Sequence, residues 1–172
     1  NETYFGSSSL MINNFSGNNI LIGNVNLNIE SNKGVDYYDM NMNVEKENNI
    51  TLDLRGKFEI EDNDFPIELD LKSKNFDISP FSAIGEDVLK NIEGLFNSNI
   101  QISGTLKKPK LKGFIQANKS NFDVPYLGIG FSFSDNSKFI IDNYDIIIDK
   151  INIEDKDFKT VGIMEGKISH NR

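Results

Sequence analysis

The sequence predicts an all-β protein, built as an elongated antiparallel meander with one short helix near residues 80–92. Apolar and polar residues alternate with a period of two over most of the chain, which is typical of half-buried strands. Short polar segments of the length that joins hairpins separate the alternating runs. Only one stretch replaces this alternation with helical spacing, so helix is expected to be a minor part of the fold.

The composition argues against several classes of function. A formal net charge of −8 disfavours nucleic acid, because neutralising phosphates takes clustered Lys and Arg, and it disfavours an anionic membrane surface for the same reason. The chain has no cysteine and a single histidine, His170, so thiolate chemistry and a Ser-His-Asp triad are not expected. We therefore expect no enzyme activity, no metal site and no cofactor.

The clearest alternation lies in residues 38–71, which we expect to form three successive strands. Pairing outward from the loop between the second and third strands puts Phe58 beside Ile67 and Gly56 beside Leu69. Charged side chains are then left on the opposite, solvated side of the sheet. The inward-facing residues that this segment predicts are Leu52, Leu54, Phe58, Ile67 and Leu69.

The segment Ile100–Ala117, IQISGTLKKPKLKGFIQA, alternates on both sides of a polar stretch and predicts a hairpin. With Lys107–Lys110 as the loop, Gly104 faces Gly113 on the apolar side, and Pro109 lies in the loop. Two opposed glycines would leave room above the sheet, although glycines at a bulge have the same pattern. The apolar residues expected on one face are Ile100, Ile102, Leu106, Leu111 and Ile115.

One stretch predicts a helix of about three turns over residues 80–92. Ser79 is suited to be its N-cap, Pro80 suits the first helical position, and Gly94 follows its end. An apolar stripe with helical spacing would lie over an edge or a face of the sheet. The residues of that stripe are Phe81, Ile84, Val88 and Ile92.

After the hairpin the chain returns to strands, and Pro125 separates one strand from the next. Phe131 and Phe133 alternate with small polar residues there and are further inward candidates. We expect a single β-rich segment of a larger chain, in three parts. These are an N-terminal meander over residues 1–75, a helix-containing connection over 76–94, and the hairpin with its following strands over 95–172.

The alternation leaves the environment of the apolar face open. In a sandwich a second sheet buries such a face, whereas in an open, curled sheet the face is available to a ligand. Period-two patterning is the same in both architectures.

Three segments together resemble the TamB and AsmA-like family of translocation and assembly module proteins. They are Phe76–Gly94, then Ile100–Ala117 with its apolar strand, Gly, Pro, Gly and second apolar strand, then Phe122–Gly128 with Val-Pro-x-x-Gly. The closing run Lys159–Ile168 also fits, so the resemblance covers about residues 65 to 170.

This resemblance implies a periplasmic protein tethered to the inner membrane by a segment outside this chain. It also implies a β-sheet curled into a long apolar groove, a β-taco, that moves phospholipid between the two membranes of the cell envelope. Proteins of the family also support outer-membrane biogenesis and protein secretion together with an outer-membrane barrel of the BamA superfamily. The family offers no catalytic residues.

We therefore expect a groove segment whose partners are phospholipid acyl chains, with a barrel contact outside this segment. The expected groove residues are Leu52, Leu54, Phe58, Ile67, Leu69, Ile100, Ile102, Leu106, Leu111, Ile115, Phe131 and Phe133, and the structural motif is Gly104, Pro109, Gly113 and Pro125. The alternative is a chaperone-like scaffold that binds β-strands of client outer-membrane proteins. A glycan-binding sandwich is a third reading, disfavoured because the chain has no Trp.

Overall fold

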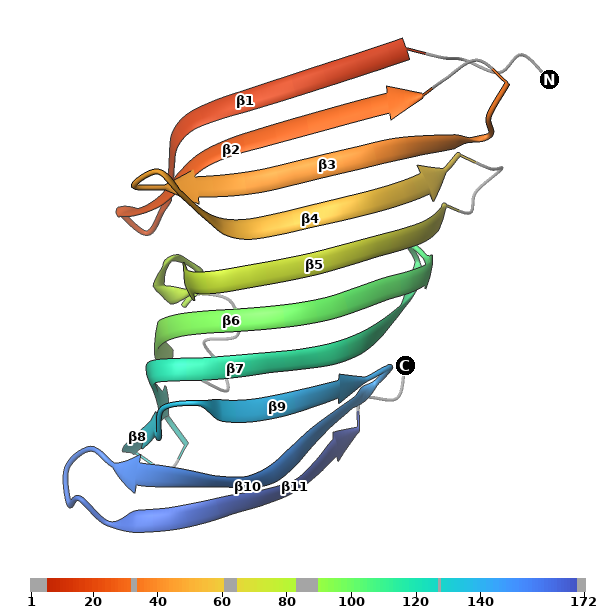
Figure 1. The fold of residues 1–172 in the computed structure, drawn as a ribbon. Coiled ribbons are helices and arrows are strands. Elements are labelled where there is room, and N and C mark those ends of the chain that lie inside the picture. Colours follow the sequence, from red (N-terminus) through yellow and green to blue (C-terminus); the bar gives the residue numbers. More distant parts are fainter. Residues whose placement is uncertain (1–5, 32–33, 61–64, 83–89, 127, 170–172) are drawn as a thin grey trace.

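The computed structural model describes residues 6–31, 34–60, 65–82, 90–126 and 128–169. Within these residues the protein is one antiparallel sheet of eleven strands, which confirms the all-β prediction. The strands lie side by side in a single layer (Figure 1). No second sheet covers either face of the part of the chain that the structure describes, so the sandwich prediction is wrong for this part.

The strands follow one another along the chain, and their bounds are as follows. They are β1 (Gly6–Gly17), β2 (Ile20–Ser31), β3 (Tyr37–Lys46), β4 (Asn49–Glu59), β5 (Pro66–Asp77), β6 (Lys90–Thr105), β7 (Lys108–Val124), β8 (Ile129–Phe133), β9 (Ser137–Asp142), β10 (Asp145–Asp155) and β11 (Val161–Ser169). A single 3-10 turn, η1 (Ser79–Phe81), follows β5.

Sequence neighbours pair from β1 to β8, and β10 and β11 complete the order. β8 and β9 share one strand position, because both pair with β7 on one side and with β10 on the other. The three-part division of the chain stays a prediction, and β5 and β6 each run across one of its divisions.

Two of the hairpin turns depend on residues that tolerate a positive φ. Asn18 and Asn19 between β1 and β2 have φ of 50° and 61°, and Glu47 and Asn48 between β3 and β4 have φ of 54° and 61°. Two successive positive φ values are characteristic of the type I′ turn, whose twist matches that of the flanking strands. Part of the asparagine content of the chain therefore has a conformational explanation.

The predicted N-terminal meander is confirmed in its strands and in its register. Phe58 pairs with Ile67 and Gly56 pairs with Leu69. Gly56 has φ of 151°, and a Cβ added there would collide with the backbone carbonyl oxygen of Glu68. Glycine is thus required at this position for the close approach of β5, not to leave a space for a ligand.

The predicted register of the central hairpin is wrong. The turn contains only Leu106 and Lys107, so Gly104 pairs with Pro109 and Gly113 pairs with Ile100. The two glycines are therefore not opposed, and Pro109 belongs to strand β7 instead of a loop. The two-residue turn is compatible with the same alternation as the longer loop, which is why the pattern did not distinguish them.

The predicted helix is wrong at both of its described ends. Only Ser79–Phe81 form a helical turn, its N-cap is Ile78 and not Ser79, and the Asp77 carboxylate accepts a hydrogen bond from the Ser79 N–H at 3.0 Å. Lys90, Asn91 and Ile92 belong to β6, where the Asn91 side chain donates to Asp123 of β7 at 2.7 Å. Strand pairing therefore overrides the helical spacing there. Residues 83–89, with Ile84 and Val88, lie outside the described residues.

Candidate functional site: the apolar face

The sheet register joins apolar side chains into continuous rows that cross the whole molecule. Paired residues of an antiparallel sheet point to the same face, so a chain of pairs traces one row. The central row crosses ten strands and contains Leu10, Leu27, Met42, Leu54, Leu71, Ile100, Gly113, Ile141, Ile146 and Ile168. It contains no polar side chain.

A second row on the same face runs beside the central row. Its members are Ile12, Val25, Val44, Leu52, Ser73, Ser98, Ile115, Phe139, Ile148 and Gly166. On the other side of the central row a third row joins Ser8, Ile29, Met40, Gly56, Leu69, Ile102 and Leu111. The apolar face is defined here by these three rows, and none of their members is charged.

The register brings nine of the predicted groove residues together on this apolar face. Leu54 and Ile100 are in the central row, Leu52 and Ile115 in the second, and Leu69, Ile102 and Leu111 in the third; Phe58 and Ile67 form the next pair along β4 and β5. Leu106 was predicted wrongly, because it is a turn residue and is 66% exposed. Pro125 follows β7 and accepts a hydrogen bond from the Gly128 N–H.

The prediction missed half of the central row. Leu10, Leu27, Met42, Leu71, Ile141, Ile146 and Ile168 were not named as groove candidates. The alternation in their strands was a sufficient signal, since each lies two residues from another apolar residue in the same strand. What the sequence did not give was the order in which distant strands join.

Most of the apolar face is only partly buried. No large side chain among the described residues is less than 2% exposed, and the row members Leu27, Leu54, Leu71 and Ile102 are half-buried. Side chains in an ordinary core lose nearly all their contact with water, because a second layer packs on them. The apolar face therefore keeps accessible hydrocarbon surface along the sheet.

One end of the apolar face is bridged by η1. Phe81 stacks on Phe76 with ring centroids 6.1 Å apart, and Asn18 donates from its side chain to the Pro80 carbonyl at 3.0 Å. Asn18 lies in the turn between β1 and β2, so η1 connects β5 to a hairpin three strand positions away, at the left of Figure 1. Pro80 is buried in this contact. The connection restrains the sheet at that end.

A hollow of about 590 Å³ lies at the bridged end. It is lined by Ile22, Lys46, Glu47, Asn49, Ile50, Thr51, Lys74, Asn75, Phe76, Asp77 and Leu95. Four of these side chains are hydrocarbon or aromatic and four are charged, so the hollow is amphipathic. A bound amphiphile would find both kinds of surface there.

Toward the other edge of the sheet, aromatic side chains fill the apolar face. Phe122 lies 5.7 Å from Phe131 and 4.9 Å from Phe133 between ring centroids, and Phe133 lies 5.3 Å from Phe139. Phe122 is 8% exposed. Two of the predicted groove residues, Phe131 and Phe133, thus belong to a packed cluster, and this part of the face is more closed than the rest.

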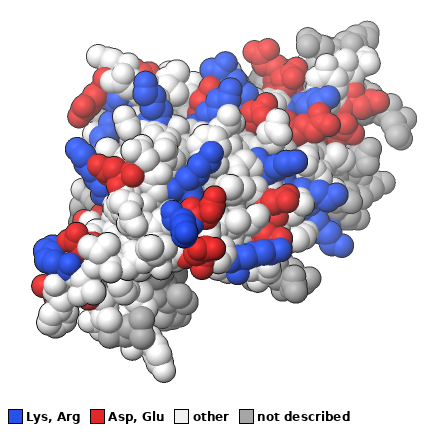
Figure 2. Space-filling model, turned by 60° about the horizontal axis from the view of Figure 1, so that its bottom comes forward, with Lys and Arg blue, Asp and Glu red and all other residues white. Residues whose placement is uncertain are grey.

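The opposite face of the sheet is polar and carries charges of both signs. The row next to the central one contains Ser9, Asn28, Asn41, Arg55, Asp70, Gln101, Lys112, Asp142, Asp145 and Ser169. Figure 2 shows positive and negative side chains interleaved over the surface. No area of one sign is large enough there to attract a polyanion.

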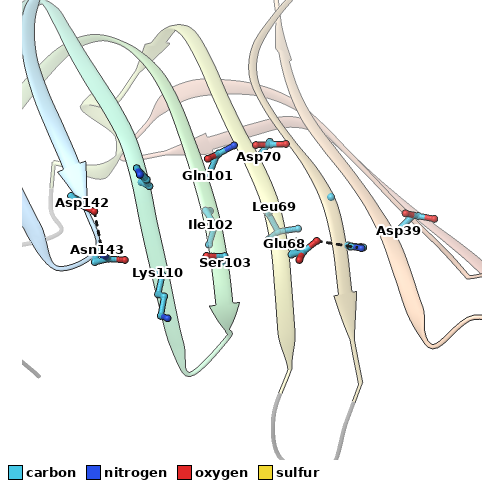
Figure 3. Close-up of a pocket in the computed structure, with 13 residues that line it drawn as sticks. Asp39, Glu68, Leu69, Asp70, Gln101, Ile102, Ser103, Lys110, Asp142 and Asn143 are labelled. Carbon is cyan, nitrogen blue, oxygen red and sulfur yellow. Dashed lines mark hydrogen bonds and ion pairs between the residues drawn. The ribbon is translucent and has the colours of Figure 1, made fainter.

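A hollow of about 640 Å³ lies on this polar face, over β3 to β9 (Figure 3). Its side chains include Asp39, Glu68, Asp70 and Lys110, and Lys57 pairs with Glu68 at 3.3 Å. A twisted sheet is saddle-shaped and is therefore hollowed along one diagonal on each face. The mixture of paired and exposed charges gives no defined ligand chemistry, so we do not assign this hollow as the site.

One ion pair fastens the polar side of the aromatic region. The Lys156 Nζ lies 2.8 Å from the Asp123 Oδ1, while Asn91 donates to the Oδ2. The Lys156 hydrogen bond, followed by that of Asn91, lowers the pKa of Asp123 below its ordinary value. Asp123 is on β7 and Lys156 follows β10, so the pair connects strands on either side of β8.

The described residues contain no group of three or more side chains suited to hold a metal ion. His170 lies outside the described residues. Among the described helices, none has the length and hydropathy needed to cross a membrane. Comparison with protein-family models, curated proteins and solved structures gave no match.

Proposed function

We propose that the chain is a lipid-conducting segment, in which phospholipid acyl chains lie along the apolar face while their headgroups stay in water. The observation that carries this proposal is the uncovered apolar face, whose three rows contain no charge. Exposed apolar surface of this extent marks a site for a hydrophobic ligand or partner. The absence of fixed polar contacts on it suits a ligand that slides.

The dimensions of the face are compatible with acyl chains. Ten strands spaced by about 4.8 Å give a row roughly 43 Å long, whereas one leaflet of a bilayer contributes about 15 Å of hydrocarbon. Each methylene that leaves water is worth about 0.8 kcal/mol. A chain of many methylenes is therefore held firmly without any specific contact, and it can move along the row at little cost.

The likeness to the TamB and AsmA-like family, together with this face, supports a periplasmic location and a role between the inner and outer membranes. In this proposal an inner-membrane tether and an outer-membrane barrel of the BamA superfamily lie outside the chain. The segment itself contributes the surface on which phospholipid travels, and it performs no chemistry on its cargo.

Native mass spectrometry tests the proposal after the purified chain is incubated with phosphatidylethanolamine and phosphatidylglycerol vesicles. We expect phospholipid adducts on the native sequence and a large loss of adducts for Ile102→Asp, because a charge would interrupt the third row. The matched control is Gln101→Asp, one residue away on the polar face, which should keep the adducts. Circular dichroism checks that both variants remain folded. Absence of adducts on the native chain, or equal loss in both variants, would contradict lipid binding on this face.

A second candidate function is a scaffold that receives β-strands of client outer-membrane proteins. It is supported by the unpaired edges of β1 and β11. Strand capture needs backbone hydrogen bonds at an edge, whereas lipid passage does not. A proline in β11, for example Ile163→Pro, should therefore reduce client binding and leave phospholipid adducts unchanged if both functions are present.

A further inference from the structure

We propose that β11 of one copy pairs in antiparallel fashion with β1 of a second copy, which joins the sheets of successive copies edge to edge. This interaction goes beyond the lipid function, because it depends on the backbone edges and not on any ligand. The argument uses the exposure and composition of the two edges, the direction of the strands, and the register of the rows.

Both edge strands are exposed, and β1 lacks the usual protection. Every residue of β1 except Gly17 is exposed, and the exposed fractions of Leu10 and Met11 are 52% and 68%. β1 contains no charged residue over its twelve positions. Isolated edges commonly carry Lys or other charges that prevent pairing with another chain. An uncharged strand of this length is therefore a suitable template for a further strand.

The edge of β11 is accessible as well. Val161 and Ile163 are each 65% exposed and Ile168 is 58% exposed. Of its nine residues, only Glu165 and Lys167 are charged. Opposite an uncharged β1, neither charge would meet a like charge directly.

The strand directions favour a head-to-tail arrangement. Each neighbouring pair in the sheet is antiparallel, and ten strand positions separate the two edges inclusively, so β1 and β11 run in opposite directions. A second copy displaced along the sheet without rotation therefore presents its β1 antiparallel to β11 of the first. Its apolar face also lies on the same side, so the apolar rows continue from one copy into the next.

The rows define one register that preserves the character of every position. The central row ends at Ile168 on one edge and begins at Leu10 on the other, so these residues become neighbours across the interface. On the polar side, Met11 and Lys167 end another common row and become neighbours in the same way. Lys167 keeps its ion pair with Asp145 on the other side, at 2.7 Å.

A two-fold contact between two β1 strands is the competing arrangement. It would satisfy one edge of each copy and leave both β11 edges uncovered. The contact between β11 and β1 covers one edge of each kind and is repeated by every added copy, so it forms an open-ended assembly. The two arrangements predict different responses to charge.

The first test compares Met11→Glu with Met11→Lys by analytical ultracentrifugation over a range of concentrations. Glu beside Lys167 of the next copy should strengthen association, and Lys in the same place should weaken it, each by up to about five-fold. Since the Met11 side chain is exposed, circular dichroism should show both variants folded. Equal weakening by both charges is the result expected of the two-fold contact and would overturn the proposal, as would a native chain that stays monomeric at all concentrations.

The second test uses a disulfide, which is unambiguous because the chain has no cysteine. Leu10→Cys combined with Ile168→Cys should give a ladder of covalent oligomers under mild oxidation, since directly opposed residues have a separation that a disulfide can bridge. Within one copy the two positions lie at opposite edges of the sheet (Figure 1). Leu10→Cys alone should remain monomeric; efficient dimers from this single variant, or no ladder from the double variant, would overturn the β11-to-β1 register.

Discussion

The ladder from β2 to β5 and the region from β7 to β10 share the same rows but differ in how far the apolar face is filled. In the β2–β5 ladder each strand pairs with its sequence neighbours, and aliphatic side chains such as Leu54 are half-buried. In the β7–β10 region one strand position is divided between β8 and β9, and four phenylalanines pack together there. Continuous hydrogen bonding therefore does not imply a uniformly open surface. The ladder is the better place for a mobile hydrophobic ligand, and the aromatic region is the better core.

Truncation of one side chain in each region should give the largest contrast. Phe122→Ala removes the buried centre of the aromatic cluster and should lower the free energy of unfolding by about 3–5 kcal/mol. Leu54→Ala removes a half-buried side chain that water already reaches and should cost about 1–2 kcal/mol. Urea unfolding followed by circular dichroism measures both. Similar losses would show that the two parts of the face are equally packed.

Glycine substitution tests the close approach of strands within the β2–β5 ladder. Gly56→Ala should cost about 3 kcal/mol, because its φ of 151° is strained for alanine and the new Cβ would collide with the Glu68 carbonyl. The matched control is Gly166→Ala, with φ of 153° and no atom within 4 Å, which should cost only about 1–2 kcal/mol. Thermal unfolding would disprove the collision if the two variants were equally stable.

The bridge of η1 across the end of the ladder can be weakened by Asn18→Ala. This change removes the hydrogen bond to the Pro80 carbonyl and should cost about 1 kcal/mol. Hydrogen exchange should then increase in the β1–β2 hairpin and around η1, but not in the aromatic region. Increased exchange over the whole sheet would mean that the bridge acts on global stability instead of on one end.

The smallest effect is expected at the ion pair of the aromatic region. The lowered pKa of Asp123 means that its pair with Lys156 stabilises the fold above the ordinary carboxyl value of 3.8, and that this stability is lost as the pH falls through the folded-state pKa. Because both side chains are about one-third exposed, Asp123→Asn should cost at most about 1 kcal/mol at neutral pH. The difference from the native chain should disappear under strongly acidic conditions. Lys156→Gln should behave in the same way, and a constant difference at all pH values would argue against the pair.

The sequence predicted the faces of the strands better than their partners. The register at Phe58 and Ile67 is as predicted, whereas in the central hairpin Gly104 pairs with Pro109, four positions earlier than the predicted partner Gly113. An even displacement leaves every side chain on its original face, so Ile102 and Leu111 still lie on the apolar face despite the wrong register. Leu106 alone was misplaced, because it became part of the turn.

The helix failed for a different reason. Helical spacing of apolar residues is a local signal, while the fate of Lys90–Ile92 depends on β7 and on the Asp123 carboxylate that accepts from Asn91. The contacts of η1 with Asn18 are likewise between residues 62 positions apart, and no local pattern indicates them. The sequence could predict which faces are apolar, but it could not predict where distant segments close one end of the sheet.

The meander order of the strands also bears on how the protein folds and how its length can change. Because most strands contact only the strands before and after them in the chain, the sheet can nucleate at any hairpin and grow outward one strand at a time. Removing or duplicating a whole hairpin would keep both the antiparallel order and the assignment of residues to each face. A gene encoding such a sheet can therefore be lengthened by internal duplication in two-strand steps, with each intermediate length able to fold.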